Sequence, residues 1–371
     1  MASKNARRKK WNSDLGKIAS KSAILQKKSG IIKKKYYKFF LHKSRVVNSS
    51  YNIIGDHEAQ EAEGGEVDLH QFYNDCKKNP GHIQFIPVEK FTLKHLPEGL
   101  QDPCLYKLIK ASADMTVRVS VTMTSPDRPQ FWAGTTQPYP FCNLKNEPQL
   151  RTGSGRIWNV NKMKDGEVQD GYYHSSYTKC WCQKCQDSDC PSNVWWEFSV
   201  HTACHVVFDV TEASHTKLRL FFDSDASPLV IVDKFEFLYS SKDYDICALN
   251  CVTCDKALGE KLMKIYKCHL DIWEEILFNP SYSRDKHKMA FIVSHPHGCP
   301  KQISIGQWKD KILIHDRTKF TYSTTTCPGS SGATVHCVGY SGTAWRSEFV
   351  HSGTKSGLNY SGVGQVFSKS K

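Results

Sequence analysis

Thr325-Thr-Cys-Pro-Gly-Ser-Ser-Gly-Ala-Thr-Val335 is the stretch of this sequence that says most about its fold. It places Ser331 two residues after Gly329 and directly before Gly332. Glycines here let the backbone turn tightly, so the amides of Gly329 and Ser331 could point together at a developing negative charge. Ser331 is therefore a candidate nucleophile. A plain Gly/Ser-rich turn between two strands is the alternative.

A second stretch, Ser199-Val-His-Thr-Ala-Cys-His205, places a histidine shortly after a strand-like run. A serine hydroxyl is a weak nucleophile near neutral pH and needs a base within hydrogen-bond reach. His205 could be that base. The alternative is a histidine packed in a β core without a catalytic role.

A third stretch, Asp243-Tyr-Asp245-Ile-Cys-Ala-Leu249, places acids directly before an apolar strand. A carboxylate here could orient the imidazole and stabilise its charged form. Asp245 is the better candidate because the apolar run begins at the next residue. Asp243 and Asp233 remain alternatives, as does a surface role for Asp245.

In chain order, these stretches resemble the trypsin-like (chymotrypsin-fold, PA clan) serine peptidases, over roughly residues 115 to 365. Four strings carry the resemblance. Thr202-Ala-Cys-His205 matches the family's T-A-A-H motif, and Asp245-Ile-Cys-Ala-Leu249 matches its D-I-A-L motif. Gly329-Ser-Ser-Gly-Ala333 matches the G-D-S-G-G motif, and Thr152-Gly-Ser-Gly-Arg-Ile157 resembles the G-S-G-x-[IL] strand that precedes the histidine. The resemblance implies two six-stranded β-barrels and a serine endopeptidase. It also implies a catalytic triad of His205, Asp245 and Ser331, an acyl-enzyme intermediate, and an oxyanion hole made by Gly329 and Ser331.

Three departures from the family pattern separate this chain from the secreted digestive members. Ser330 stands where those members have the aspartate that receives a newly cut N-terminus, so activation by N-terminal cleavage is not implied. Val206 replaces the half-cystine that usually follows the histidine, and Ala333 replaces the second glycine. Similar patterns occur in HtrA-like, glutamyl-endopeptidase-like and viral cysteine-type relatives.

The resemblance also suggests which residue precedes the cleaved bond, the position called P1. In glutamyl endopeptidases and picornaviral main proteases, a Thr or Ser five residues before the nucleophile and a histidine on a later strand recognise Glu or Gln. Thr326 and His351 match these two positions. A hydroxyl and an imidazole can both hydrogen-bond a carboxylate or an amide. The alternative is that His351 is an ordinary strand histidine.

The pattern of the remaining sequence favours an all-β fold with one helix. Short alternating apolar runs recur at 116–123, 198–202, 217–222, 289–294 and 333–338, with turn residues between them. Between 257 and 277, apolar residues recur at spacings of three and four, which predicts an amphipathic helix joining two β halves. Asn279-Pro280 is a plausible stop beyond it.

Charge and composition divide the 371-residue chain into three parts. Residues 1–50 contain 15 Lys or Arg and one acid, whereas the other 321 residues contain 35 Lys or Arg and 36 Asp or Glu. Residues 1–66 are therefore expected to be a disordered basic then acidic tail, 67–112 a short ordered lead-in without assigned chemistry, and 113–366 the peptidase domain. The basic tail could bind nucleic acid through residues 1–50, or could have no specific partner.

Cysteine spacing raises the question of a metal. Four cysteines, Cys180, Cys182, Cys185 and Cys190, lie close enough in sequence to share one zinc ion, and Cys251 and Cys254 could supply a second pair. Catalysis itself would need no cofactor. Free thiols or occasional disulfides are the alternatives.

Location and activity are the remaining expectations. The N-terminus lacks a signal-peptide core, and no stretch approaches the ~20 apolar residues of a membrane span. A soluble, intracellular protein, cytoplasmic or nuclear, is expected to act on proteins or peptides without a membrane partner. A catalytically inactive protease fold used as a binding module, and a nucleic-acid-binding protein acting through the tail, are the other function classes.

Overall fold

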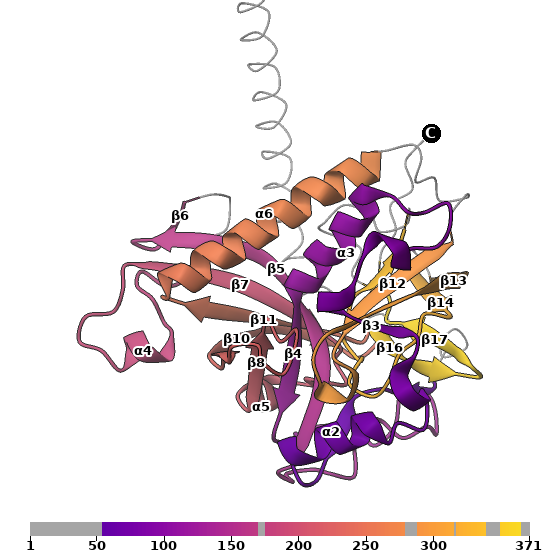
Figure 1. Cartoon of the computed structure of the whole chain (residues 1–371). Coiled ribbons are helices and arrows are strands. Elements are labelled where there is room, and N and C mark those ends of the chain that lie inside the picture. Colours follow the sequence, from indigo (N-terminus) through magenta and orange to yellow (C-terminus); the bar gives the residue numbers. More distant parts are fainter. Residues whose placement is uncertain (1–53, 170–174, 279–287, 315–316, 339–348, 365–371) are drawn as a thin grey trace, which may run out of the picture.

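The computed structural model describes residues 54–169, 175–278, 288–314, 317–338 and 349–364, and these residues form two antiparallel β-sheets (Figure 1). The first sheet has the strand order β10-β11-β7-β5-β4-β8-β9, with β2 and β6 paired to β5. Its strands are β2 (Gln60–Ala62), β4 (Thr116–Val121), β5 (Leu150–Lys164), β6 (Glu167–Val168), β7 (Val194–Thr202), β8 (Thr216–Leu220), β9 (Val230–Val232), β10 (Phe235–Ser241) and β11 (Ile246–Thr253).

The second sheet has the order β1-β16-β17-β14-β13-β12-β15, with β3 paired to β13. Its strands are β1 (Asp56–His57), β3 (Phe85–Pro87), β12 (Met289–Ser294), β13 (Gln302–Ile314), β14 (Arg317–Tyr322), β15 (Val335–Cys337), β16 (His351–Lys355) and β17 (Leu358–Ser361). The predicted trypsin-like fold of two β units is confirmed. The described sheets have nine and eight strands where six each were expected, because short strands such as β1, β2 and β3 extend them.

Each sheet encloses its own apolar core, which is why alternating sequence runs predicted the strands. The first core includes Val117, Val119 and Leu249, and it also contains Val206, the residue at the half-cystine position. The second core is lined by residues such as Phe320 and includes Ala333. Burying apolar side chains on the inner faces of both sheets is the main force that closes this fold.

The two longest described helices lie against each other along one side of the sheets (Figure 1). The predicted helix is α6 (Lys256–Phe278), which lies between β11 and β12 in the chain and so joins the two sheets. Its apolar face is buried at Leu262, Trp273 and Ile276. Gly259 is required because a Cβ there would lie 2.1 Å from the Trp196 ring on β7. Asn279-Pro280 lies outside the described residues.

The lead-in at 67–112 contributes most of α3 (Pro103–Met115) and most of α2 (Glu66–Asn74), so the predicted boundary at 112 falls inside a helix. Asp102 caps α3, since its carboxylate accepts from the amides of Cys104 and Leu105 at 2.7 and 3.0 Å. Among the described residues, the shorter helices are α4 (Gln183–Gln186), α5 (Val210–Ala213) and four 3₁₀ turns at Pro80–His82, Val88–Lys90, Leu93–His95 and Pro296–Gly298.

The tail was expected to be mobile through residue 66, and the structure differs in its last part. Residues 54–66 include β1 and β2, which pair with β16 and β5. Backbone pairing at two sheet edges holds this stretch despite its acidic, Gly-containing sequence. Residues 1–53, with the basic run, lie outside the described residues.

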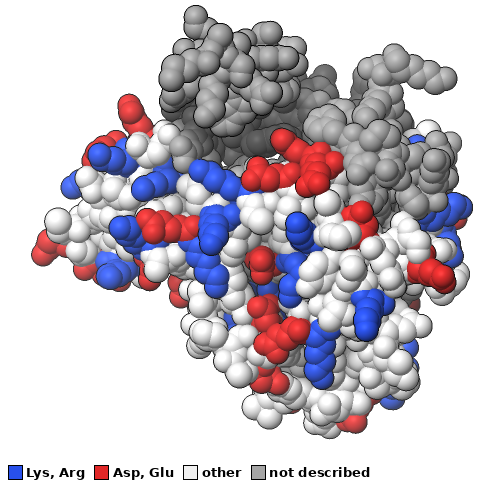
Figure 2. All heavy atoms as spheres, turned by 45° about the horizontal axis from the view of Figure 1, so that its top comes forward, with Lys and Arg blue, Asp and Glu red and all other residues white. Residues whose placement is uncertain are grey.

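The described surface agrees with a near-neutral body. Figure 2 shows Lys and Arg interspersed with Asp and Glu over one face, without a patch of one sign. Within the described ranges no helix is long and apolar enough to span a membrane.

Candidate active site

The turn that carries Ser331 lies between β14 and β15 and depends on its two glycines. Gly329 has φ +95° and Gly332 has φ +85°, a region that side chains other than hydrogen strongly disfavour. A Cβ on Gly329 would lie 2.4 Å from the His295 carbonyl oxygen, and one on Gly332 would lie 2.2 Å from Thr202 Oγ1. The glycines therefore serve both the turn and its close packing.

Ser154, in the predicted Gly-Ser-Gly strand, fixes this turn from the first sheet. Its amide donates to the Ser331 carbonyl at 2.8 Å, and its hydroxyl donates to the Gly329 carbonyl at 2.8 Å. Ser330 is buried with its hydroxyl 3.1 Å from that of Ser294 and accepting from the Cys327 amide. Both serines hold the nucleophile turn in one shape.

The three predicted triad side chains lie in one hydrogen-bonded row. His205 follows β7 and Asp245 precedes β11, both on the first sheet, while Ser331 comes from the second. His205 Nε2 lies 2.7 Å from Ser331 Oγ, and its Nδ1 lies 2.9 Å from Asp245 Oδ2. Of the three candidate acids, Asp245 is the one on the His205 ring, while Asp243 and Asp233 have no such contact in the described structure.

The carboxylate of Asp245 is held ionised. Burial alone would raise its pKa, but the charge and hydrogen bonds of His205, with a hydrogen bond from Ser352, lower the pKa below its ordinary value. The Ser352 hydroxyl on β16 donates to Oδ2, and the His205 amide donates to Oδ1 at 3.1 Å. Asp245 can therefore orient the imidazole and stabilise its positive charge.

A buried ion network supports the His205 loop from behind. The Arg128 guanidinium donates to the His205 carbonyl at 3.0 Å and forms two bonds to Glu212 at 2.6 and 2.7 Å. Arg151 reaches the same carboxylate at 2.9 Å, and all three side chains have no exposed surface. Two cations and one anion in a dry interior require this exact pairing, because each charge unpaired there would be costly.

Glu58 covers Ser331, although it belongs to the stretch that was predicted to be a disordered tail. Its carbonyl oxygen accepts from the amides of Gly329 at 2.6 Å and Ser331 at 3.2 Å, the two groups predicted as an oxyanion hole. Its own amide lies 3.1 Å from Ser331 Oγ. The Glu58 peptide unit thus rests directly on the nucleophile.

The Glu58 side chain lies against the predicted specificity residue His351. Its carboxylate is 2.5 Å from His351 Nε2 and pairs with Lys78 Nζ, which also donates to Thr326 Oγ1 at 3.2 Å. Burial opposes its ionisation, yet the contacts with His351 and Lys78 lower the pKa of Glu58 to about 2. The Tyr322 hydroxyl lies 2.6 Å from Nδ1 of His351 and fixes the ring. Thr326 reaches Glu58 only through Lys78.

The predicted cysteine cluster has a different fourth member. The sulfurs of Cys180, Cys182, Cys185 and Cys254 lie within 4.8 Å of one another, whereas Cys190 is exposed and outside the group. Cys254 follows β11, and its sulfur is 3.5 Å from that of Cys182. Sequence proximity misled here, because the sheet brings in a residue 64 positions further along than Cys190. All 15 cysteines are free thiols.

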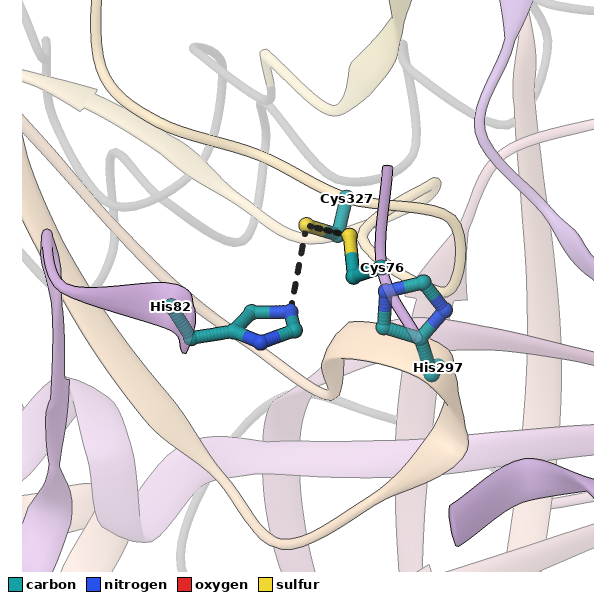
Figure 3. A group of neighbouring side chains, drawn as sticks. All are labelled: Cys76, His82, His297 and Cys327. Atoms are coloured by element: carbon teal, nitrogen blue, oxygen red, sulfur yellow. Dashed lines mark hydrogen bonds between the residues drawn. The ribbon is translucent and has the colours of Figure 1, made fainter. Parts of the chain in front are cut away.

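A second group of possible metal ligands was missed. Cys76, His82, His297 and Cys327 converge from three segments far apart in the chain (Figure 3), with their ligand atoms within 4.8 Å of one another. All four are buried. Cys327 begins the nucleophile turn, so this group lies directly behind it.

Sequence reasoning also missed Lys78 and Ser352, which contact Glu58 and Asp245. The signal for Ser352 was its place next to His351 in the same strand. For Lys78, no local pattern pointed to the site, because the lead-in segment reaches it only through the tertiary fold.

Two antiparallel sheets, with a serine from one facing a histidine and an aspartate from the other, define the chymotrypsin-type fold class. No protein-family model and no curated protein matches this chain. Among solved structures it is similar to an HtrA-type protease, AlgW with decapeptide (TM-score 0.34, 11% identity, 69% of this chain and 62% of that one). It is also similar to a serine endoprotease from Yersinia pestis (TM-score 0.34, 10% identity, 69% and 60%).

This chain spans less than two thirds of the length of either protein. At about one identical residue in ten, these likenesses do not assign a function to this chain.

Proposed function

We propose that this chain is a serine endopeptidase that cleaves after Glu through a triad of Ser331, His205 and Asp245. The observation that carries the proposal is the row of contacts from Asp245 through His205 to Ser331, ending at two amides that hold a carbonyl oxygen. A binding module without activity would have no need for this whole arrangement.

The row of contacts supports ordinary acyl transfer. As Ser331 Oγ attacks a substrate carbonyl, His205 Nε2 takes its proton and Asp245 stabilises the imidazolium. The amides of Gly329 and Ser331 stabilise the oxyanion. His205 then donates the proton to the leaving amine, and water hydrolyses the acyl-enzyme by the same route.

The preference for Glu at P1 is proposed from the contacts of Glu58. The buried His351 imidazole and the partly exposed Lys78 ammonium together offer a hydrogen bond and a positive charge to a carboxylate. Gln has the same shape, but it lacks the charge that pairs with Lys78. We therefore expect Glu to be preferred over Gln, with Thr326 acting by positioning Lys78.

Peptides that differ only at P1 test this preference. His351→Ala is expected to lower kcat/KM for a Glu peptide by about 100-fold, because a buried carboxylate loses a charge-assisted hydrogen bond. The loss for an Ala peptide should be much smaller. Steady-state kinetics measure kcat/KM for both peptides. An equal fall in kcat/KM for the two peptides would mean that His351 supports the fold and does not determine specificity.

We also propose that Cys180, Cys182, Cys185 and Cys254 hold a structural zinc ion. Four thiolates satisfy tetrahedral zinc, and the ion would join the loop before β7 to the end of β11. Cys185→Ser should remove one zinc per chain in elemental analysis, whereas Cys190→Ser, the matched control, should not. Equal zinc content in both variants would refute the site.

Nucleic-acid binding by residues 1–50 and an intracellular location rest on the sequence alone, since residues 1–53 lie outside the described part of the chain.

A further inference from the structure

Residues 55–62 cross the active site as an extended strand that pairs with a different sheet on each side of Glu58. Asp56 and His57 pair antiparallel with Thr354 and Gly353 on β16. On the other side, β2 pairs antiparallel with residues 150–152 of β5. We propose that this stretch is a substrate of its own chain, cleaved between Glu58 and Ala59. This rests on the proposed function.

Residues 55–57, which precede Glu58, make the kind of side-chain and backbone contacts that hold a specific peptide ligand. The His57 ring packs edge-on against Phe141 at 4.7 Å between centroids, and 5.6 Å from the His205 ring. The Gly55 amide donates to the Tyr360 hydroxyl at 2.9 Å, and its carbonyl accepts from Gln137 at 3.0 Å. A Cβ on Gly55 would lie 2.1 Å from the Thr354 carbonyl oxygen, so this subsite selects glycine.

The side after the bond is equally well held. Ala59 is 6% exposed and packs in the first core. The Gln60 side chain accepts from His297 Nδ1 at 2.7 Å, and Ala62 is 1% exposed. Pairing of an extended segment with two sheet edges, with pockets for alternate side chains, is how β-sheet proteins recognise peptides. The recognised sequence is therefore Gly-Asp-His-Glu followed by Ala-Gln-Glu-Ala.

The reacting groups are in place for one hydrolysis. Ser331 Oγ adds to the Glu58 carbonyl carbon while its proton passes to His205, and the oxyanion stays on the two amides that already hold the Glu58 oxygen. The bond to Ala59 nitrogen then breaks, and His205 gives that nitrogen the proton. Water attacks the Glu58 ester with His205 as base, which frees Ser331 and leaves a Glu58 carboxylate and an Ala59 amine.

Self-cleavage is tested on the full chain by intact-mass analysis and N-terminal sequencing. Wild-type protein is expected to yield a fragment that begins at Ala59, at a rate independent of protein concentration. Ser331→Ala should stay intact. Glu58→Lys, which places a cation against Lys78 and His351, should slow cleavage at least ~100-fold. Glu63→Lys makes the same charge change at an exposed site and should be cleaved like wild type.

Labelling with a fluorophosphonate separates failure of this inference from failure of the proposed function. Ser331 is fully buried under Glu58. In the Glu58→Lys variant, repulsion from Lys78 should displace residue 58, so the probe should reach and label Ser331 in the uncleaved protein. If wild type stays intact while Glu58→Lys labels, the peptidase proposal stands and self-cleavage is refuted. If wild type stays intact and neither protein labels, the peptidase proposal itself fails.

A second inference comes from the group in Figure 3. We infer that Cys76, His82, His297 and Cys327 bind zinc. Two thiols and two imidazoles are a common tetrahedral set. His297 Nε2 is buried without a hydrogen-bond partner, while its Nδ1 is fixed by Gln60, as expected of a ligand with a second-shell contact.

Asn79 donates hydrogen bonds to two of the sulfurs. The Asn79 side-chain Nδ2 donates to Cys327 Sγ at 3.0 Å, and the Asn79 backbone amide donates to Cys76 Sγ at 3.4 Å. A zinc ion here would anchor the start of the nucleophile turn to the lead-in segment.

Elemental analysis of full-length variants tests this site. Cys327→Ala should contain one zinc per chain less than wild type, and Cys299→Ala, a buried thiol outside the group, should not. Unchanged zinc in folded Cys327→Ala would overturn the inference. If that variant does not fold, zinc-edge X-ray absorption of wild type decides, because this site requires nitrogen as well as sulfur ligands and sulfur alone would refute it.

Discussion

Ser331→Ala is expected to lower kcat/KM toward a Glu peptide by about 10⁴- to 10⁶-fold, because the triad acts as a unit and loses its nucleophile. The change removes one oxygen and leaves the backbone amides of the turn in place. Kinetics with the peptide Gly-Asp-His-Glu-Ala-Gln-Glu-Ala, with thermal unfolding as a check on the fold, would measure the effect.

Ser330→Ala is the matched control for that experiment. It removes the same atom from the neighbouring buried residue, whose hydroxyl contacts Ser294 and Cys327 and not His205. We expect a loss of less than about tenfold, because this hydroxyl makes only neutral structural hydrogen bonds away from the reacting atoms. Comparable losses in the two variants would contradict the assignment of Ser331 as nucleophile.

Glu212→Ala is expected to lower the free energy of unfolding by about 3–5 kcal/mol, because it leaves Arg128 and Arg151 buried without their counter-ion. Urea denaturation measures the change. Glu260→Ala removes one partner of an exposed helical pair with Lys256 and should cost less than ~0.5 kcal/mol. Similar values for both would mean that the buried network is not a stabilising element.

The same network gives a pH dependence with a definite sign. Burial would raise the pKa of Glu212, but the hydrogen bond and charge of Arg128, with Arg151, hold it below its ordinary value. A carboxyl group whose pKa is lower in the folded state than in the unfolded state contributes to the free energy of unfolding above its unfolded-state pKa. That contribution is lost as the pH falls through the folded-state pKa. The stability difference between wild type and Glu212→Gln should therefore shrink in acid.

Local sequence patterns were sufficient for several strands, such as β4, β8 and β12, for the long helix and for the nucleophile turn. Met289–Ser294 formed a strand with the predicted limits, because a short, nearly continuous apolar run is typical of a strand buried on both faces. Ser331, His205 and Asp245 could be chosen because each sits in a string of distinctive residues at a strand end or turn. Their approach to within hydrogen-bond distance followed from the fold class.

Long-range contacts could not be read in this way. The stretch around Glu58 is acidic and contains glycine, a composition that is also typical of a mobile linker. Its position is fixed only by the pairing of β1 with β16 and of β2 with β5. Cys254 replaced Cys190 for the same reason. The group of possible metal ligands behind Ser331 joins residues up to 251 positions apart, and at such a separation the sequence spacing carries no information.

The covalent tether of Glu58 to the rest of the chain has a consequence for every other substrate. A segment linked to its own cleft has an effective concentration that can reach the millimolar range. A free protein at micromolar concentration would seldom displace it. Each molecule would then act first on itself, once, and its activity toward other proteins would begin only after a delay set by that single event.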